Sequence, residues 1–305
     1  MFSTQALFTQ ILMAGSISSW GHLGFVLVGF VISIYLLACL ALRLWHGRLI
    51  FLPSRTIQYT PDQINLAYED VWLPIETRSG KIETIHGWWI PSKSPTDDRV
   101  ILDFHGNRNN IGANLNYAQL FHQLGLSVFL VDYRGYGRST PRFPSESAIY
   151  QDVERAWHYL VHERQISPEK IFVFGHSLGG AIAINLATQH PEIAGLIIEG
   201  SFTSIRKMVD YRDKYWMFPV NWILTQRFDS ITKVPHLKMP ILYTHGTEDT
   251  VVPPEMSQTL YELTPEPKQL LVIPEAGHND VSEVGGQRYR QVVGQFLSQT
   301  CSVSA

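Results

Sequence analysis

The sequence predicts an α/β protein with a mostly parallel sheet, preceded by one membrane-spanning helix. From residue 100 onward, short continuous apolar runs alternate with segments of helical periodicity. Runs without polar alternation suit strands that are covered on both faces, as in a parallel sheet with helices on either side. Near the N-terminus, an uncharged apolar run of about 20 residues would span roughly 30 Å as a helix, the thickness of the bilayer hydrocarbon core.

Composition excludes several classes of function. The 305 residues are 45% hydrophobic, enough for one large core or at most two domains. A net charge of -3 gives no electrostatic case for a nucleic-acid partner. Two cysteines, Cys39 and Cys301, are too few for a disulfide framework or a cysteine-based metal site. No His-Glu-x-x-His or clustered carboxylate pattern occurs, so we expect neither a metal nor another cofactor.

Residues 1–42 contain no charged side chain, and we divide them into an N-terminal segment, 1–22, and a transmembrane helix, 23–42. A cleaved signal peptide would begin with a basic region and end in a small-x-small site, and neither is evident. A buried core helix would show a polar face, and none is visible in this run. Basic residues follow the helix at Arg43, Arg48 and Arg55, whereas none precedes it. The positive-inside rule therefore predicts a single-pass membrane protein with its main domain on the cytoplasmic side.

The rest of the chain reads as a connector at 43–69, a catalytic α/β domain at 70–300 and a short tail at 301–305. Two strands at 71–76 and 82–90 flank the turn sequence Arg-Ser-Gly-Lys, which predicts a hairpin at an antiparallel edge. The buried strands are expected at 100–104, 127–131, 171–174, 196–198, 241–244 and 270–273, and the helices at about 112–124, 145–164, 178–189, 255–263 and 285–298.

A candidate nucleophile lies in the sequence Phe-Gly-His-Ser-Leu-Gly-Gly, centred on Ser177. A buried strand runs into this Gly-x-Ser-x-Gly motif and a helix follows it, which is the context of a nucleophile elbow. Gly175 and Gly179 remove the Cβ atoms that would collide in so sharp a turn. We expect the helix N-terminus at Leu178 to stabilise negative charge beside the serine.

Other loops that follow buried strands should meet Ser177 at the carboxyl edge of the sheet. His-Gly-Asn follows the first of these strands, and we assign the oxyanion donors to the amides of Asn107 and Leu178. The alternative is a capped loop whose asparagine side chains bond their own backbone. The glycine- and arginine-rich loop at 132–139 is expected to be structural.

The acid and the base of a triad are predicted from chain order. Asp249 follows the strand at 241–244 and His278 follows the last strand, so the order serine, aspartate, histidine is that of the α/β hydrolases. Glu199 also ends a buried strand and competes with Asp249 for the acid's role, and Glu248 is adjacent to Asp249. The acid must accept the Nδ1–H of the histidine and hold its tautomer.

Six motifs together give the chain a family resemblance over residues 50–300. They are FHGNRNN (104–110), VDYRGYGRS (131–139), FGHSLGGA (174–181), GSFTSIRKM (200–208), HGTEDTVVP (245–253) and GHND (277–280). With them the chain resembles the α/β-hydrolase superfamily and, more narrowly, the membrane-anchored, BEM-like branch of the α/β-hydrolase-domain (ABHD) serine hydrolases. The resemblance implies Ser177 as nucleophile, Asp249 as acid and His278 as base, and fatty acyl esters and thioesters among the substrates. Arg108 departs from the pattern, because a small residue more often follows His-Gly-Asn.

Residues 200–240 form an insertion in which aromatic and basic side chains alternate. We interpret it as a short helical lid over Ser177 whose apolar face receives an acyl chain and faces a bilayer. The alternative is a helical excursion that buries its own aromatic residues on the domain.

The sequence therefore predicts a membrane-anchored serine hydrolase that cleaves small-molecule or lipid acyl esters or thioesters through an acyl-enzyme. Three alternatives remain open: an acyltransferase with the same triad, a serine peptidase and a non-catalytic scaffold. Acyl-chain length, leaving group and oligomeric state are not specified by any motif.

Overall fold

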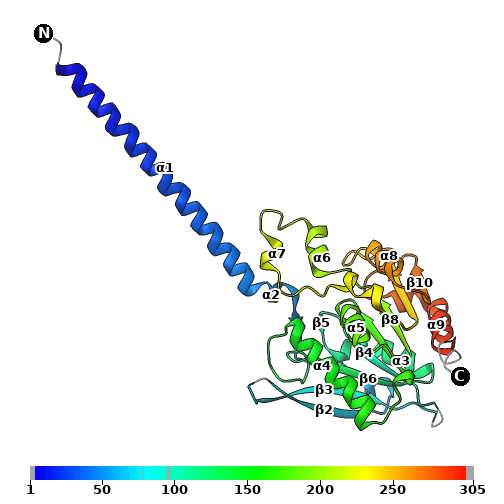
Figure 1. The fold of residues 1–305 in the computed structure, drawn as a ribbon. Coiled ribbons are helices and arrows are strands. Elements are labelled where there is room, and N and C mark those ends of the chain that lie inside the picture. The colour runs from blue at the N-terminus through cyan, green and yellow to red at the C-terminus, as the bar shows by residue number, and fades with distance from the viewer. Residues whose placement is uncertain (1–3, 78, 95–96, 300–305) are drawn as a thin grey trace. The chain divides into compact units, whose positions relative to one another are not determined.

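The computed structural model describes residues 4–77, 79–94 and 97–299, with side chains from residue 22 onward. The chain forms two compact units, drawn in Figure 1. One combines the N-terminal residues through His46 with residues 216–225, and the other contains residues 47–215 and the chain from 226.

The N-terminal unit is built on one long helix, α1 (Thr4–Trp45). It extends beyond the predicted span of 23–42 at both ends. Its stretch His22–Trp45 contains an 18-residue window with a mean hydropathy of 2.8 and is long and apolar enough to cross a membrane. The single N-terminal apolar helix that the sequence predicts is confirmed. Within the same unit, the short helix α7 (Val220–Ile223) packs against α1.

The second unit contains an eight-stranded sheet in the order β10-β9-β8-β7-β4-β6-β3-β2. The hairpin of β2 and β3 joins the sheet antiparallel to β6, and the pairs from β6 through to β10 are parallel. The mostly parallel sheet with one antiparallel edge is therefore confirmed. The strands are β2 (Glu69–Glu76), β3 (Ile82–Ile90), β4 (Val100–Phe104), β6 (Ser127–Asp132), β7 (Ile171–His176), β8 (Gly195–Glu199), β9 (Ile241–Gly246) and β10 (Lys268–Ile273).

Helices cover both faces of this sheet, which explains its continuous apolar strands. Alternate residues of β4 point to opposite faces. Val100, Leu102 and Phe104 pack into one buried cluster with α4, α5 and α8, whereas Ile101 packs into a second cluster with α3 and α9. The helices are α3 (Leu115–Gln123), α4 (Glu146–His158), α5 (Leu178–Gln189), α6 (Ile205–Arg212), α8 (Pro254–Leu263) and α9 (Val281–Gln299).

Two regions differ in detail from the sequence-based expectation. Only the first part of the predicted helix at 145–164 is α-helical. It forms α4, which ends at His158, and a π-helical turn, Tyr159–Glu163, follows directly. The connector at 43–69 contains α2 (Gly47–Ile50), a 3-10 turn (Pro61–Ile64) and a two-residue strand, β1 (Leu52–Pro53). β1 pairs in parallel with β5 (Arg108–Asn109), in the loop after β4. The connector therefore supports the loop that carries the predicted oxyanion donor.

Candidate active site

Ser177 occupies a strained turn between β7 and α5. Its backbone has φ 55° and ψ -117°, a conformation that residues other than glycine rarely adopt. A Cβ atom at Gly175 would lie 2.3 Å from the Gly179 carbonyl oxygen, and one at Gly179 would lie 1.9 Å from the Phe104 carbonyl oxygen. Only glycine fits at either position. The turn has the geometry of a nucleophile elbow, with Ser177 at the N-cap of α5.

The structure brings Ser177, His278 and Asp249 together at the carboxyl edge of the parallel strands. His278 Nε2 lies 3.0 Å from Ser177 Oγ, and His278 Nδ1 lies 2.6 Å from Asp249 Oδ2. The three side chains come from the loops after β7, β9 and β10. The His278 side chain is 9% exposed and the Asp249 side chain is fully buried. This is the connectivity of a Ser-His-Asp triad.

Four hydrogen-bond donors surround the Asp249 carboxylate. Asp249 Oδ1 accepts the amide N–H groups of Val251 and Val252, each at 2.8 Å. Asp249 Oδ2 lies 3.0 Å from His245 Nε2, in addition to its contact with His278. Burial by itself would raise the pKa of Asp249, but the hydrogen bonds from His245 and His278 hold it well below its usual range. Asp249 is therefore ionised and fixed in orientation.

Glu199, the competing acid, has other partners. Its carboxylate accepts hydrogen bonds from the hydroxyls of Tyr117 and Thr244, the latter at 2.9 Å, and burial raises its pKa. Its backbone carbonyl accepts the Ser177 amide at 2.8 Å. Glu248 is exposed to solvent. Of the three acidic residues considered, it is Asp249 that contacts the imidazole of His278.

The loop after β4 passes close to Ser177. A Cβ atom on Gly106 would lie 3.4 Å from Ser177 Cβ. Tyr136 O–H donates to the Asn107 carbonyl oxygen at 3.0 Å, and the Leu52 amide of β1 donates to Asn107 Oδ1 at 3.2 Å. Within the described residues, neither the Asn107 nor the Leu178 amide donates a hydrogen bond to a protein acceptor. Both amides are available to a substrate oxygen.

The capped-loop interpretation applies to a different asparagine. Asn110 Oδ1 accepts the Gly112 amide at 3.0 Å, and Asn110 Nδ2 donates to the Thr56 carbonyl oxygen at 2.9 Å. Arg108, the departure from the family pattern, is exposed and pairs through its backbone in β5.

Two further histidines, to which the sequence assigns no role, contact residues of the predicted triad. His176 Nε2 donates to the His278 carbonyl oxygen at 2.8 Å, and burial lowers the pKa of His176 to about 4, so that it is neutral. His245 contacts Asp249 with Nε2 and Ser257 Oγ with Nδ1, at 2.6 Å. His176 is the last residue of β7 and His245 is the last but one of β9, and this placement before the motifs is the signal that could have identified them.

A buried carboxyl group on β4 gives a pH-dependence that can be measured. Asp103 accepts a hydrogen bond from Asn114 Nδ2 at 2.5 Å, but burial raises its pKa to about 8. An unfolded aspartate loses its proton near pH 4, so the folded state binds one more proton between about pH 4 and 8 and stability falls as pH rises through this window.

We therefore expect Asp103→Asn to gain stability over the parent chain as pH rises, by up to about 1.4 kcal/mol for each pH unit within the window. Thermal unfolding of the full chain in detergent, at one pH near 5 and another near 8, measures the difference. If the melting temperatures of variant and parent differed by the same amount at both pH values, the raised pKa of Asp103 would be contradicted.

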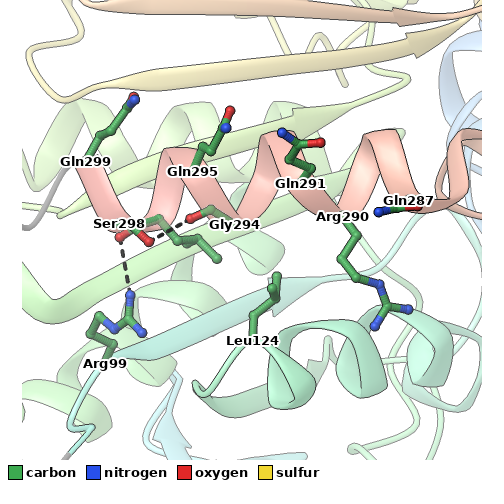
Figure 2. Close-up of a pocket in the computed structure, with 10 residues that line it drawn as sticks. Arg99, Leu124, Gln287, Arg290, Gln291, Gly294, Gln295, Ser298 and Gln299 are labelled. Carbon is green, nitrogen blue, oxygen red and sulfur yellow. Dashed lines mark hydrogen bonds between the residues drawn. The ribbon is translucent and has the colours of Figure 1, made fainter.

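A separate pocket has a volume of about 600 Å³. Figure 2 shows residues that line it along α9. Arg99 and Leu124, which line it, precede β4 and β6 and therefore lie at the amino ends of these parallel strands. The pocket is at the opposite edge of the sheet from Ser177 and is not part of the candidate site. In the part of the chain that the structure describes, no group of three or more His, Cys, Asp or Glu residues could hold a metal ion.

Comparisons with known proteins identify the fold and the family. Residues 95–232 match a family model described as serine aminopeptidase S33, and residues 196–283 match one described as the alpha/beta hydrolase fold. The chain is 34% identical to protein bem46 of Schizosaccharomyces pombe, over 81% of this chain and 82% of that protein. It is 30% identical to the alpha/beta hydrolase domain-containing protein WAV2 of Arabidopsis thaliana, over 84% of this chain and 88% of that protein.

Solved structures show the same fold at lower identity. An esterase of Pyrococcus furiosus superimposes with a TM-score of 0.66 at 22% identity, covering 81% of this chain and 98% of the esterase. A monoacylglycerol lipase of Paleococcus ferrophilus superimposes with a TM-score of 0.55 at 19% identity, covering 71% of this chain and 99% of the lipase. The chain belongs to the α/β-hydrolase superfamily and, within it, to the branch that includes bem46 and WAV2.

Proposed function

We propose that the protein is a membrane-anchored serine hydrolase that cleaves acyl esters or thioesters. The observation that carries the proposal is the hydrogen-bonded series Ser177, His278, Asp249, with separations of 3.0 and 2.6 Å, at the carboxyl edge of the sheet. Membership of the α/β-hydrolase superfamily and the esterase and lipase among the structural neighbours are consistent with it.

The reaction begins when Ser177 Oγ attacks the acyl carbonyl carbon and its proton passes to His278 Nε2. The Asn107 and Leu178 amides hold the oxyanion, a contribution of about 3 kcal/mol for each donor. Asp249 keeps the His278 Nδ1–H in place and stabilises the imidazolium. The bond from the carbonyl carbon to oxygen or sulfur then breaks, and the leaving group takes the proton from His278. Water, deprotonated by His278, releases the acid and restores Ser177.

Peptide hydrolysis is the second candidate, favoured by the description of the family model that matches residues 95–232. An acyltransferase would use the same acyl-enzyme with an alcohol or amine as acceptor. Product analysis separates the three: an ester or thioester hydrolase releases a free acid from acyl substrates, a transferase gives a new ester or amide when an acceptor is added, and a peptidase cleaves peptide amides.

We propose that α1 anchors the enzyme as a single-pass helix. Its stretch His22–Trp45 has the required length and hydropathy. Arg43 lies near the end of this stretch, and Arg48 and Arg55 follow it, which favours the cytoplasmic side for the catalytic domain.

The direct experiment is covalent labelling of the full chain, in membranes or detergent, with a fluorophosphonate probe that reacts with activated serines. Hydrolysis of a panel of acyl esters and thioesters of different chain lengths is then followed. The proposal predicts one labelled site and release of free acid. An absence of both labelling and turnover would favour a non-catalytic scaffold.

A further inference from the structure

A ten-residue stretch of the insertion after β8 packs on the N-terminal helix. Residues 216–225, Trp-Met-Phe-Pro-Val-Asn-Trp-Ile-Leu-Thr, carry no charged side chain, although Lys214 precedes them and Arg227 follows them. They form one compact unit with α1, and α7 within them packs against that helix. We name residues 216–225 the docked loop.

Two side chains of α1 hold the docked loop. Tyr35 O–H donates to the Met217 carbonyl oxygen at 2.8 Å, and the Tyr35 ring lies parallel to the Phe218 ring with centroids 6.0 Å apart. Nearer the end of the helix, the Arg43 guanidinium donates to the Trp222 carbonyl oxygen and lies 4.8 Å from the centroid of the Trp222 ring. The docked loop therefore lies along α1, with its beginning beside Tyr35 and its later part beside Arg43.

These contacts fix the depth of the loop relative to the apolar stretch of α1. Tyr35 lies ten residues before Trp45, where the stretch ends, which is about 15 Å along a helix. Arg43 lies near that end, and its long side chain can reach the polar interface. Where α1 crosses a bilayer, the contact at Tyr35 is about 12 Å deeper than Arg43, among the lipid acyl chains.

The side chains of the docked loop suit such an environment. Trp216, Met217 and Trp222 are 77%, 59% and 50% exposed. Large apolar side chains grouped at a loop tip would be costly in water, but hydrocarbon can cover them, and tryptophan favours the membrane interface.

Protein groups bond several backbone groups of the docked loop, which is helical only at α7. In hydrocarbon each unpaired peptide group costs several kcal/mol, so non-helical backbone needs protein packed against it and bonded to it, or access to water. The carbonyl oxygens of Met217 and Trp222 accept from the two α1 side chains described above. Pro219 has no amide hydrogen, and its carbonyl oxygen accepts the Trp222 amide at 2.9 Å. The Thr225 amide lies 3.2 Å from His46 Nε2.

We propose that the docked loop enters the bilayer beside the C-terminal half of α1, as a re-entrant loop in contact with lipid acyl chains. This inference rests on the membrane anchoring proposed above. It ties the insertion that follows β8 to the lipid phase. That suits an amphiphilic acyl substrate drawn from the bilayer rather than from water.

The test measures the depth of single fluorescent labels. In full-length protein carrying Cys39→Ala and Cys301→Ala, an environment-sensitive nitrobenzoxadiazole label is placed at Met217→Cys and, in a second variant, at Trp216→Cys. Leu36→Cys, exposed on α1, reports the membrane helix, and Glu262→Cys, exposed on α8, reports water. Each protein is reconstituted into phosphatidylcholine vesicles, with or without lipid carrying a doxyl group on carbon 12 of its acyl chain.

At positions 217 and 216 we expect doxyl quenching comparable to position 36, and quenching by aqueous iodide about fivefold weaker than at position 262, because hydrocarbon excludes the ion. If both loop labels behave like position 262 while position 36 is quenched by doxyl lipid, α1 is a membrane anchor and the proposal of a re-entrant loop is wrong. If position 36 is also quenched only by iodide, α1 does not cross the bilayer, and the proposals of a membrane anchor and of a re-entrant loop are both wrong. Serine labelling by the fluorophosphonate tests the hydrolase proposal independently.

Discussion

Ser177→Ala is expected to lower hydrolysis of acyl esters by about 10⁴- to 10⁶-fold, the loss seen when the nucleophile of a serine triad is removed. No other hydroxyl is placed 3.0 Å from His278 Nε2 in the described structure. The substitution removes only an oxygen atom. Its backbone at φ 55° already tolerates a side chain, so folding should be retained. Rates are measured under single-turnover conditions, with circular dichroism to confirm the fold.

The matched control is Ser298→Ala, on α9, whose hydroxyl donates to the Gly294 carbonyl oxygen 2.8 Å away. It should retain both turnover and fluorophosphonate labelling. If Ser177→Ala kept its labelling, the nucleophile would have to be another residue.

Asp249→Asn is expected to lower the rate by about 10⁴-fold, because an amide can present N–H to His278 Nδ1 and select the wrong tautomer. Glu199→Gln is the paired variant, since Glu199 is the other buried acid whose position made it a candidate. Its carboxylate bonds Tyr117 and Thr244 rather than His278, so we expect its loss of rate to stay below about tenfold.

Both variants are compared for kcat and kcat/KM on one soluble ester, alongside their melting temperatures. The assignment of the acid would be reversed, in favour of Glu199, by two results together. Glu199→Gln would lose most of its activity at an unchanged melting temperature, and Asp249→Asn would remain active.

The sheet and its helices were predictable because burial on both faces leaves a simple pattern. The expected strand at 100–104 and the helix at 178–189 match β4 and α5 residue for residue. Loops that follow parallel strands must meet at one edge, and this rule alone places Ser177, Asp249 and His278 near one another. The glycines at 175 and 179 were predicted for the steric reason that the structure gives.

Chain order did not by itself separate Asp249 from Glu199. Both end or follow buried strands, and the difference lies in where each carboxylate points. Glu199 lies on β8 and faces Tyr117 of α3, whereas Asp249 lies in a loop and reaches His278. Such orientation depends on tertiary contacts, which periodicity does not encode.

Short pairings and positioning contacts also have no sequence signal of their own. β1 and β5 contain two residues each, too few for an alternating pattern, yet they tie the connector to the loop that holds Asn107. His176 and His245 act on His278 and Asp249 across the edge of the sheet. The contact of Tyr35 with Met217 joins residues 182 positions apart, so the place of the docked loop was not predictable from the insertion's composition.

Trapping the acyl-enzyme tests directly whether Ser177 is the nucleophile. The full chain is mixed with a slowly hydrolysed acyl ester, quenched in acid within the first turnover, digested and analysed by mass spectrometry. We expect a single acyl group on Ser177 in the parent protein. Turnover without an adduct on Ser177, or an adduct on another residue, would contradict it.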